Sequence, residues 1–229
     1  MVTSLADSGP GTLRDAITQA NASPGADTID FSKTGAIKLL SNLPPITDDV
    51  TITATRPVTV NGQNEFSLFA VTGDGTDADF GGLTLVNGMS ASGGAAFFID
   101  APNGTVDITH TNISRMFAVG SDVAGGAISI QHGAVTVSAS TVTLATASGT
   151  GEAKGGAIFN ADVLIVDEGS KITKNQARGA MAQGGGIFNH GQLTLTDAFV
   201  DLNKAVGVNG ARGVNGARGE NGLSGDQGM

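Results

Sequence analysis

Three similar stretches decide the fold that this sequence predicts: GGAISIQHGAVTV at residues 125–137, GGAIFNADVLIV at 155–166 and GGGIFNHGQLTL at 184–195. An earlier glycine pair at Gly93 begins the series, and the successive intervals are 32, 30 and 29 residues. Each stretch passes from a glycine turn into residues that alternate between apolar and polar, which is the pattern of a β-strand. Short strands that repeat at near-constant length indicate a solenoid, in which each coil stacks on the previous one.

We therefore expect an all-β chain, a right-handed parallel β-helix over residues 31–206 with a short capping helix before it. An antiparallel sandwich also uses short strands and turns, but it does not predict so constant a unit length. Glycine pairs and asparagines would supply the positive φ angles at sharp corners. The asparagines expected to stack on adjacent coils are Asn160 with Asn189 and Asn175 with Asn203.

The first 30 residues are expected to form an N-terminal cap, with a helix over about residues 12–21. Thr12 can cap this helix, and Asp15 follows three residues later, as in a capping box. Its apolar residues recur at helical spacing: Leu13, Ala16, Ile17 and Ala20. Laid over the end of the solenoid, such a helix would cover both the apolar core and the exposed strand edges.

The end of the chain has a different pattern, because glycine falls at every third position from Gly207 to Gly228. This is the period of collagen, but the segment contains no proline, so a triple helix is disfavoured. We expect residues 207–229 to form a flexible glycine-rich loop or linker. No C-terminal cap is visible, so the last coil, near residues 193–206, is expected to expose strand edges and to associate.

Composition excludes several classes of protein. The chain has no Cys, so disulfide scaffolds, thiolate metal sites and cysteine nucleophiles are excluded. Its formal net charge is −9, and it has no run of basic residues, which argues against a nucleic-acid partner. No apolar stretch reaches the roughly 18 residues of a membrane helix, so membrane insertion is not expected. The chain also lacks Trp and Tyr, the usual platforms for stacking sugars.

A family resemblance rests on the N-terminal segment TSLADSGPGTLRDAI at residues 3–17, on PGADTI at 24–29 and on the repeated Gly-Gly-Ala-Ile and Phe-Asn pieces. These resemble the cap and repeats of bacterial surface proteins with right-handed parallel β-helices, in particular the chlamydial polymorphic outer-membrane-protein family and its bacterial relatives. The resemblance covers residues 3–206.

The resemblance implies an extracellular or cell-surface passenger that is often adhesive and often part of a longer chain. The first residues show no signal peptide, so we expect a mature part or a fragment. Expected partners are other copies of the chain, further coils of a longer chain, or an extracellular glycan or protein. The expected function is that of a structural, adhesive stalk without catalysis.

The alternative function is a polysaccharide-active lyase or hydrolase, because β-helices also host such enzymes. Those sites need convergent carboxylates facing one cleft. The outward positions expected to align on the central strand are Thr84, Asp107, Thr136, Ile165 and Thr194, a series with a single acid. We therefore expect no enzyme, and no catalytic or cofactor-binding residue is predicted.

The one metal-site candidate is the acidic stretch containing Asp74, Asp77 and Asp79, whose oxygens could hold Ca²⁺. Its spacing does not match an EF-hand loop, and a solvated acidic turn is the competing interpretation. His132 and His190 are expected at equivalent places two coils apart, with Ala161 between them. That separation, about 10 Å at strand spacing, is too long for one metal ion bound by both imidazoles.

Overall fold

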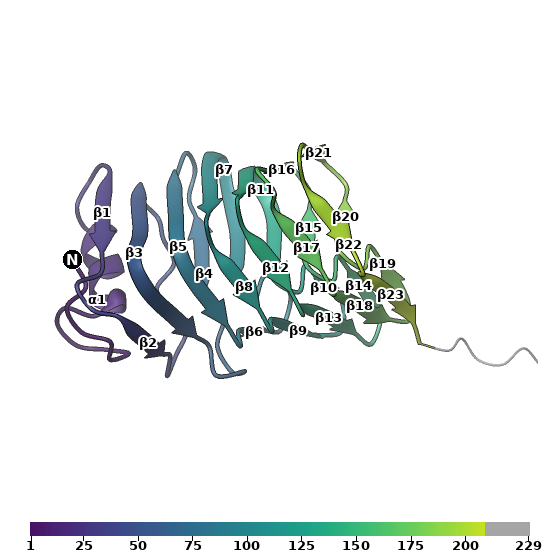
Figure 1. The fold of residues 1–229 in the computed structure, drawn as a ribbon, viewed down its shortest axis with the longest axis horizontal. Coiled ribbons are helices and arrows are strands. Elements are labelled where there is room, and N and C mark those ends of the chain that lie inside the picture. Colours follow the sequence, from purple (N-terminus) through teal and green to yellow (C-terminus); the bar gives the residue numbers. More distant parts are fainter. Residues whose placement is uncertain (209–229) are drawn as a thin grey trace, which may run out of the picture.

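The computed structural model describes residues 1–208 and shows an all-β chain whose parallel strands stack as a β-solenoid of about five turns (Figure 1). Strands pair in parallel with their counterparts in the neighbouring coil, which confirms the predicted parallel solenoid. The glycine-rich loop predicted for residues 207–229 lies outside the described residues from residue 209 onward.

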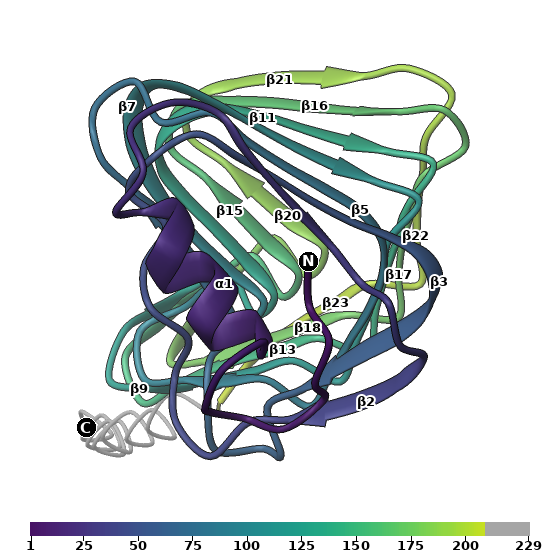
Figure 2. The same ribbon diagram turned by 90° about the vertical axis from the view of Figure 1, so that its left-hand side faces the viewer.

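Helix α1 (Leu13–Ala20) lies across the N-terminal end of the solenoid (Figure 2). The Thr12 side chain accepts a hydrogen bond from the Asp15 amide at 3.2 Å, as the capping pattern predicts. The Asp15 carboxylate accepts from the Gly11 amide at 2.7 Å, one residue before the amide that a standard capping box would use. Leu13 and Ile17 are buried against the core, so the helix covers apolar surface that would otherwise face water.

The first coils contain less regular strands. They are β1 (Asp27–Asp30), β2 (Gly35–Lys38), β3 (Val50–Asn61), β4 (Phe69–Thr72) and β5 (Ala78–Val86). Because β1 pairs with β3, the first coil begins within the residues expected to form the cap. The rings of Phe69, Phe80 and Phe97 lie with centroids 4.7–5.5 Å apart, and all three are buried in the core.

The later coils repeat the same strands around the axis. The first edge of the coil begins with β7 (Phe97–Thr109) and β11 (Ile128–Ser138) and consists of two consecutive ladders. The first parts of these strands continue in β15 (Ile158–Asn160) and β20 (Ile187–Asn189), and their second parts continue in β16 (Val163–Asp167) and β21 (Gln192–Leu195). The second edge holds β8 (Asn112–Ser114), β12 (Thr141–Thr143), β17 (Lys171–Thr173) and β22 (Phe199–Asp201). The third holds β6 (Met89–Ser90), β9 (Phe117–Gly120), β13 (Thr146–Gly149), β18 (Gln176–Gly179) and β23 (Lys204–Gly207). A short fourth ladder holds β10 (Val123–Ala124), β14 (Glu152–Lys154) and β19 (Met181–Gln183).

The glycine pairs serve two different purposes at one corner. The first glycine has a positive φ, +78° at Gly125 and +70° at Gly155, as predicted. The second glycine is needed for close approach, because a Cβ at Gly156 would overlap the carbonyl oxygen of Gly185 in the next coil. Successive coils can therefore stack at this corner only while the second position lacks a side chain.

Two further corners have positive φ, and there the expectation that glycine and asparagine occupy such corners holds only at Asn87 and at Gly82, which corresponds to His110; the later coils use other residues. One corner has φ values of 54–59° at Asn87, Arg115, Leu144, Lys174 and Leu202. The other has φ values of 47–49° at His110, Ala139, Glu168 and Asp197. A left-handed conformation costs a residue with a Cβ roughly 1–2 kcal/mol. Stacking of the coils imposes this conformation at each level, so the fold overrides local preference.

Buried amides connect adjacent coils, which confirms the predicted asparagine ladders. Asn160 Nδ2 donates to Asn189 Oδ1 at 2.6 Å, and Asn175 Nδ2 donates to Asn203 Oδ1 at 2.9 Å. Asn175 also accepts from the Ala145 amide at 2.9 Å, so its side chain links three successive coils. Asn160 and Asn175 are both buried, and these bonds satisfy polar groups that would be costly to leave unpaired.

The last described coil exposes side chains that its predecessors bury. Ile172 is fully buried, whereas Val200, its partner in the next coil, is 40% exposed. Leu195 is 48% exposed, although its partner Val166 is buried. In residues 1–208, then, the C-terminal end of the core has no cover comparable to α1.

Candidate functional site

A groove of about 540 Å³ runs along one corner of the solenoid and crosses four coils. One wall is the positive-φ corner, with Arg115, Leu144, Lys174 and Leu202 in successive coils. The other wall is formed by outward residues of β9, β13, β18 and β23, namely Phe117, Thr146, Gln176 and Lys204. We call this feature the corner groove.

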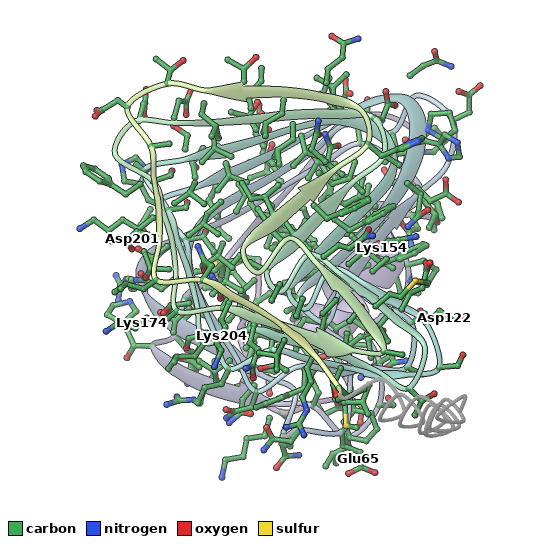
Figure 3. The ribbon with its side chains drawn as sticks, turned by 90° about the vertical axis from the view of Figure 1, so that its right-hand side faces the viewer. Glu65, Asp122, Lys154, Lys174, Asp201 and Lys204 are labelled. Atoms are coloured by element: carbon green, nitrogen blue, oxygen red, sulfur yellow. The ribbon has the colours of Figure 1, made fainter. Side chains whose placement is uncertain are left out.

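The charges of the corner groove are all positive. Its lining includes Arg115, Lys174 and Lys204, which are exposed, and it includes no Asp or Glu. Figure 3 shows Lys174 and Lys204 at the same corner of the coil, with Asp201 on the adjoining edge. In a chain of net charge −9, a groove with three cations and no lining acid is a local reversal of sign.

The three cations have no carboxylate partner among residues 1–208. The ion pairs of this part of the chain join Arg14 to Asp7, His132 to Asp100 and Lys154 to Glu152. Arg115 Nε donates to Asn87 Oδ1 at 3.1 Å, which positions the guanidinium and leaves its terminal nitrogens available. These cations can therefore bind an anion without first breaking an internal ion pair.

The outward series predicted on the central strand is wrong at its first member. Thr136 pairs with Asp107, but Asp107 pairs on its other side with Asp79, whereas Thr84 belongs to a neighbouring ladder and pairs with Asn112. The prediction failed because the coil before Asp107 contains the long, irregular strand β5. The spacing of the repeats does not determine the register of this strand. Two carboxylates, Asp79 and Asp107, thus lie in register on adjacent coils.

The acidic stretch proposed for Ca²⁺ does not converge on one point. Asp74 accepts from Asn103 Nδ2 at 2.7 Å, Asp77 accepts from the Thr105 amide and hydroxyl at 2.8 Å each, and Asp79 accepts from Thr51 Oγ1 at 3.1 Å. The described residues contain no group of three or more His, Asp or Glu suited to hold a metal ion. The Ca²⁺ site stays a prediction without support from this geometry.

The two histidines of the coil turns are not at equivalent positions. The His190 amide donates to the Asn160 carbonyl, and the Ala161 amide donates to the carbonyl of Ile130, the residue that pairs with Asn160, so His190 and Ala161 correspond. Strand β11 shifts register on either side of His132, whose Nδ1 lies 2.7 Å from Asp100 Oδ1. His132 is thus an exposed bulge residue paired with a carboxylate of the preceding coil.

An ion pair and several hydrogen bonds also hold the N-terminal cap in place. The Arg14 guanidinium donates to the Asp7 carboxylate at 2.7 Å and to the carbonyls of Ser41 and Asn42. Burial would raise the pKa of Asp7, but the hydrogen bonds from Arg14 and the Leu40 amide, together with the Arg14 charge, lower it overall. The hydrogen bond from the Gly11 amide lowers the pKa of Asp15.

Sequence reasoning missed the corner groove, although a signal for it exists. Arg115, Lys174 and Lys204 fall close to the same phase of the repeat of about 30 residues. The glycine pairs and apolar strand residues show the repeat, but they carry no information on which face of the coil each cation occupies. A ladder of like charges can be seen from sequence only after the register of the coils is known.

No family model, curated protein or solved structure matches the chain. The resemblance to polymorphic outer-membrane-protein repeats therefore remains an expectation, while the parallel solenoid itself is shown. Within residues 1–208, no helix is long and apolar enough to cross a membrane.

Proposed function

We propose that the chain is a structural and adhesive column displayed outside the cell, which presents a rigid surface and performs no covalent chemistry. The observation that carries this proposal is the continuity of the inward ladder Ile29, Ile52, Phe80, Ile108, Val137, Val166 and Leu195. One uninterrupted core along the whole described chain produces an elongated and stiff body, which suits display or spacing.

The extracellular location rests on the resemblance of residues 3–17 and of the Gly-Gly-Ala-Ile repeats to those of bacterial surface proteins. Adhesion would use the outer faces and corners of the coils, because the inward positions are filled by the core.

The last coil supports self-association as part of this function. Its inward residues Leu195 and Val200 are about half exposed, and its strands have no following coil within the described chain. Another copy, or further coils of a longer chain, would bury these side chains and pair the free strand edge. Light scattering over a range of concentrations tests this point, and a strictly monomeric species at high concentration would count against self-association.

A polysaccharide-active enzyme remains the second candidate, and the Asp79–Asp107 pair is the observation that favours it. Adjacent carboxylates are the elements of glycoside hydrolysis. Neither residue lines the corner groove, and neither is in a group of three acids. Replacing both residues, as in Asp79→Asn with Asp107→Asn, would abolish turnover if this pair were catalytic.

The decisive experiment combines a glycan array with lyase and hydrolase assays on the same preparation. The structural proposal predicts retention of a ligand without release of shortened or unsaturated products. Product formation by the unmodified chain, lost in the double Asp variant, would replace the proposal with the enzyme alternative.

A further inference from the structure

We propose that the corner groove binds a linear anionic polysaccharide built of uronic acids, lying parallel to the solenoid axis. This inference rests on the proposed adhesive function and gives it a ligand class and a location. The groove crosses four coils, and coils at strand spacing place its ends about 14 Å apart. That length suits a few consecutive sugar units of an extended chain.

The spacing of the cations fits a regular anionic polymer. Arg115 and Lys174 occupy the same corner position two coils apart, which is about 10 Å at strand spacing. In an extended 1,4-linked uronic acid chain, sugars repeat at a length close to one coil spacing, and neighbouring carboxylates point to opposite sides. Carboxylates on one side therefore recur at every second sugar, in step with Arg115 and Lys174.

Lys204 lies on the opposite wall and completes the arrangement. It occupies the outward position of β23 next to Gln176 of β18, whereas Arg115 and Lys174 belong to the positive-φ corner. A carboxylate that points away from the corner would meet this wall instead. The free terminal nitrogens of Arg115 can form the paired hydrogen bonds that a guanidinium makes with a carboxylate.

The residues between the cations can contact the C–H faces and hydroxyl groups of the sugar rings. Leu144 and Leu202 are 49% and 70% exposed and alternate with Arg115 and Lys174 along the corner. Such side chains offer apolar contact to the C–H faces of sugar rings. Phe117 provides an aromatic surface at one end of the groove, and Thr146 and Gln176 have no side-chain hydrogen bond within residues 1–208, so they can bind hydroxyl groups.

The repeat distance favours a polysaccharide over an acidic peptide. In a peptide extended along the axis, side chains on one side recur about every 7 Å, which is out of step with the separation of about 10 Å between Arg115 and Lys174. A peptide would offer main-chain amides, yet the groove wall is not a free strand edge, because β13 and β18 pair on both sides. A sugar chain needs only carboxylate, hydroxyl and C–H contacts, and the lining supplies these.

The test measures binding of polygalacturonate oligomers by calorimetry to three forms of the full chain. The first is the unmodified chain, and the second carries Arg115→Gln, Lys174→Gln and Lys204→Gln. The third is a control of equal net charge with Lys33→Gln, Lys38→Gln and Arg56→Gln, three exposed cations of the first coils. Circular dichroism and the melting temperature confirm that each variant folds.

We expect the groove variant to bind at least about tenfold more weakly, since each exposed charge pair contributes modestly. The control should bind as the unmodified chain does.

Equal weakening in both variants would show a net-charge effect and would overturn the proposal. Failure of the unmodified chain to bind would overturn it too, without affecting the structural role, which the glycan array tests with neutral sugars. Binding of polyglutamate in preference to polygalacturonate would assign the groove to an acidic peptide instead. Degradation of the oligomers by the unmodified chain would overturn the proposal that this groove is a non-catalytic adhesive site.

Discussion

The inward ladder of the solenoid begins and ends in different surroundings. Its first member, Ile29, is 2% exposed, whereas its last, Leu195, is 48% exposed. The two residues have similar apolar side chains, and the difference is the neighbour beyond them. Helix α1 packs against β1, the strand that contains Ile29, while no described residue covers Leu195 to the same extent. An inward side chain is therefore buried by the neighbouring coil or by the capping helix rather than by its own coil.

The position of a coil in the solenoid determines how much it contributes to stability. Burial of apolar surface contributes roughly 25 cal/mol per Å², so the coils with neighbours on both sides hold most of the stabilisation. The capped end should resist opening, and the opposite end, which no residue up to 208 caps, should be the place where the solenoid frays or associates; we call it the uncapped end.

The largest expected effect comes from weakening the cap. Ile17→Ala removes a side chain that is 1% exposed, and it should lower the free energy of unfolding by about 3 kcal/mol. Val200→Ala at the uncapped end should cost about 1 kcal/mol or less, because much of that side chain is already in water. Chemical denaturation of both variants measures the difference. Equal losses would mean that the two ends are equally well covered.

The next largest loss of stability should come from a substitution at the glycine-pair corner. Gly156→Ala places a methyl group against the carbonyl of Gly185 and should cost about 2–3 kcal/mol, as overpacking in a tight contact does. Gly169→Ala is the control, because Gly169 has φ of +74° but no atom near the added Cβ. It should cost only the backbone strain, about 1 kcal/mol. If both variants lose the same stability, coil contact at the glycine pair is not the limiting factor.

The cap should also be sensitive to acid. Since the folded-state pKa values of Asp7 and Asp15 are lowered from 3.8, their contribution is present above that value and is lost as the pH falls below it. Arg14→Ala should cost about 1–2 kcal/mol at neutral pH and flatten the acid dependence, because it removes the hydrogen bonds to Asp7. Melting temperatures recorded from neutral to acid pH measure this. An unchanged acid profile in the variant would exclude Asp7 as a contributor.

The smallest expected effect is stabilising. Leu144→Asn should raise the free energy of unfolding by about 1 kcal/mol, because asparagine tolerates the left-handed conformation that Leu144 adopts at φ of +56°. Val119→Asn is the control, since Val119 is 45% exposed but is absent from the positive-φ residues. It should give no gain. Stabilisation of both variants would point to loss of exposed apolar surface as the cause.

Much of the fold could be predicted from sequence because the repeat is strong. The glycine pairs at Gly125 and Gly155, the stacked amides of Asn160 and Asn175, and the cap at Thr12 all have local signatures. Each signature reflects a requirement of a few neighbouring residues, such as positive φ or a free helix amide.

The remainder depends on register between coils, which local signals do not determine. The pairing of Asp79 with Asp107 requires knowing where the irregular strand β5 aligns, and the bulge at His132 adds a residue to one coil. The left-handed conformation of Leu144 follows from the stacking of the coils, because a leucine by itself favours right-handed or extended backbone angles. The corner groove combines residues from four coils and shares this limitation.

The most direct test of the account is native-state hydrogen exchange in dilute solution, read strand by strand. The account predicts strong protection in β1, β3 and the interior strand β12, and much faster exchange in β22 and β23 at the uncapped end. Protection of β22 and β23 equal to that of β12 in a monomeric sample would contradict it, because the two ends would then be covered alike.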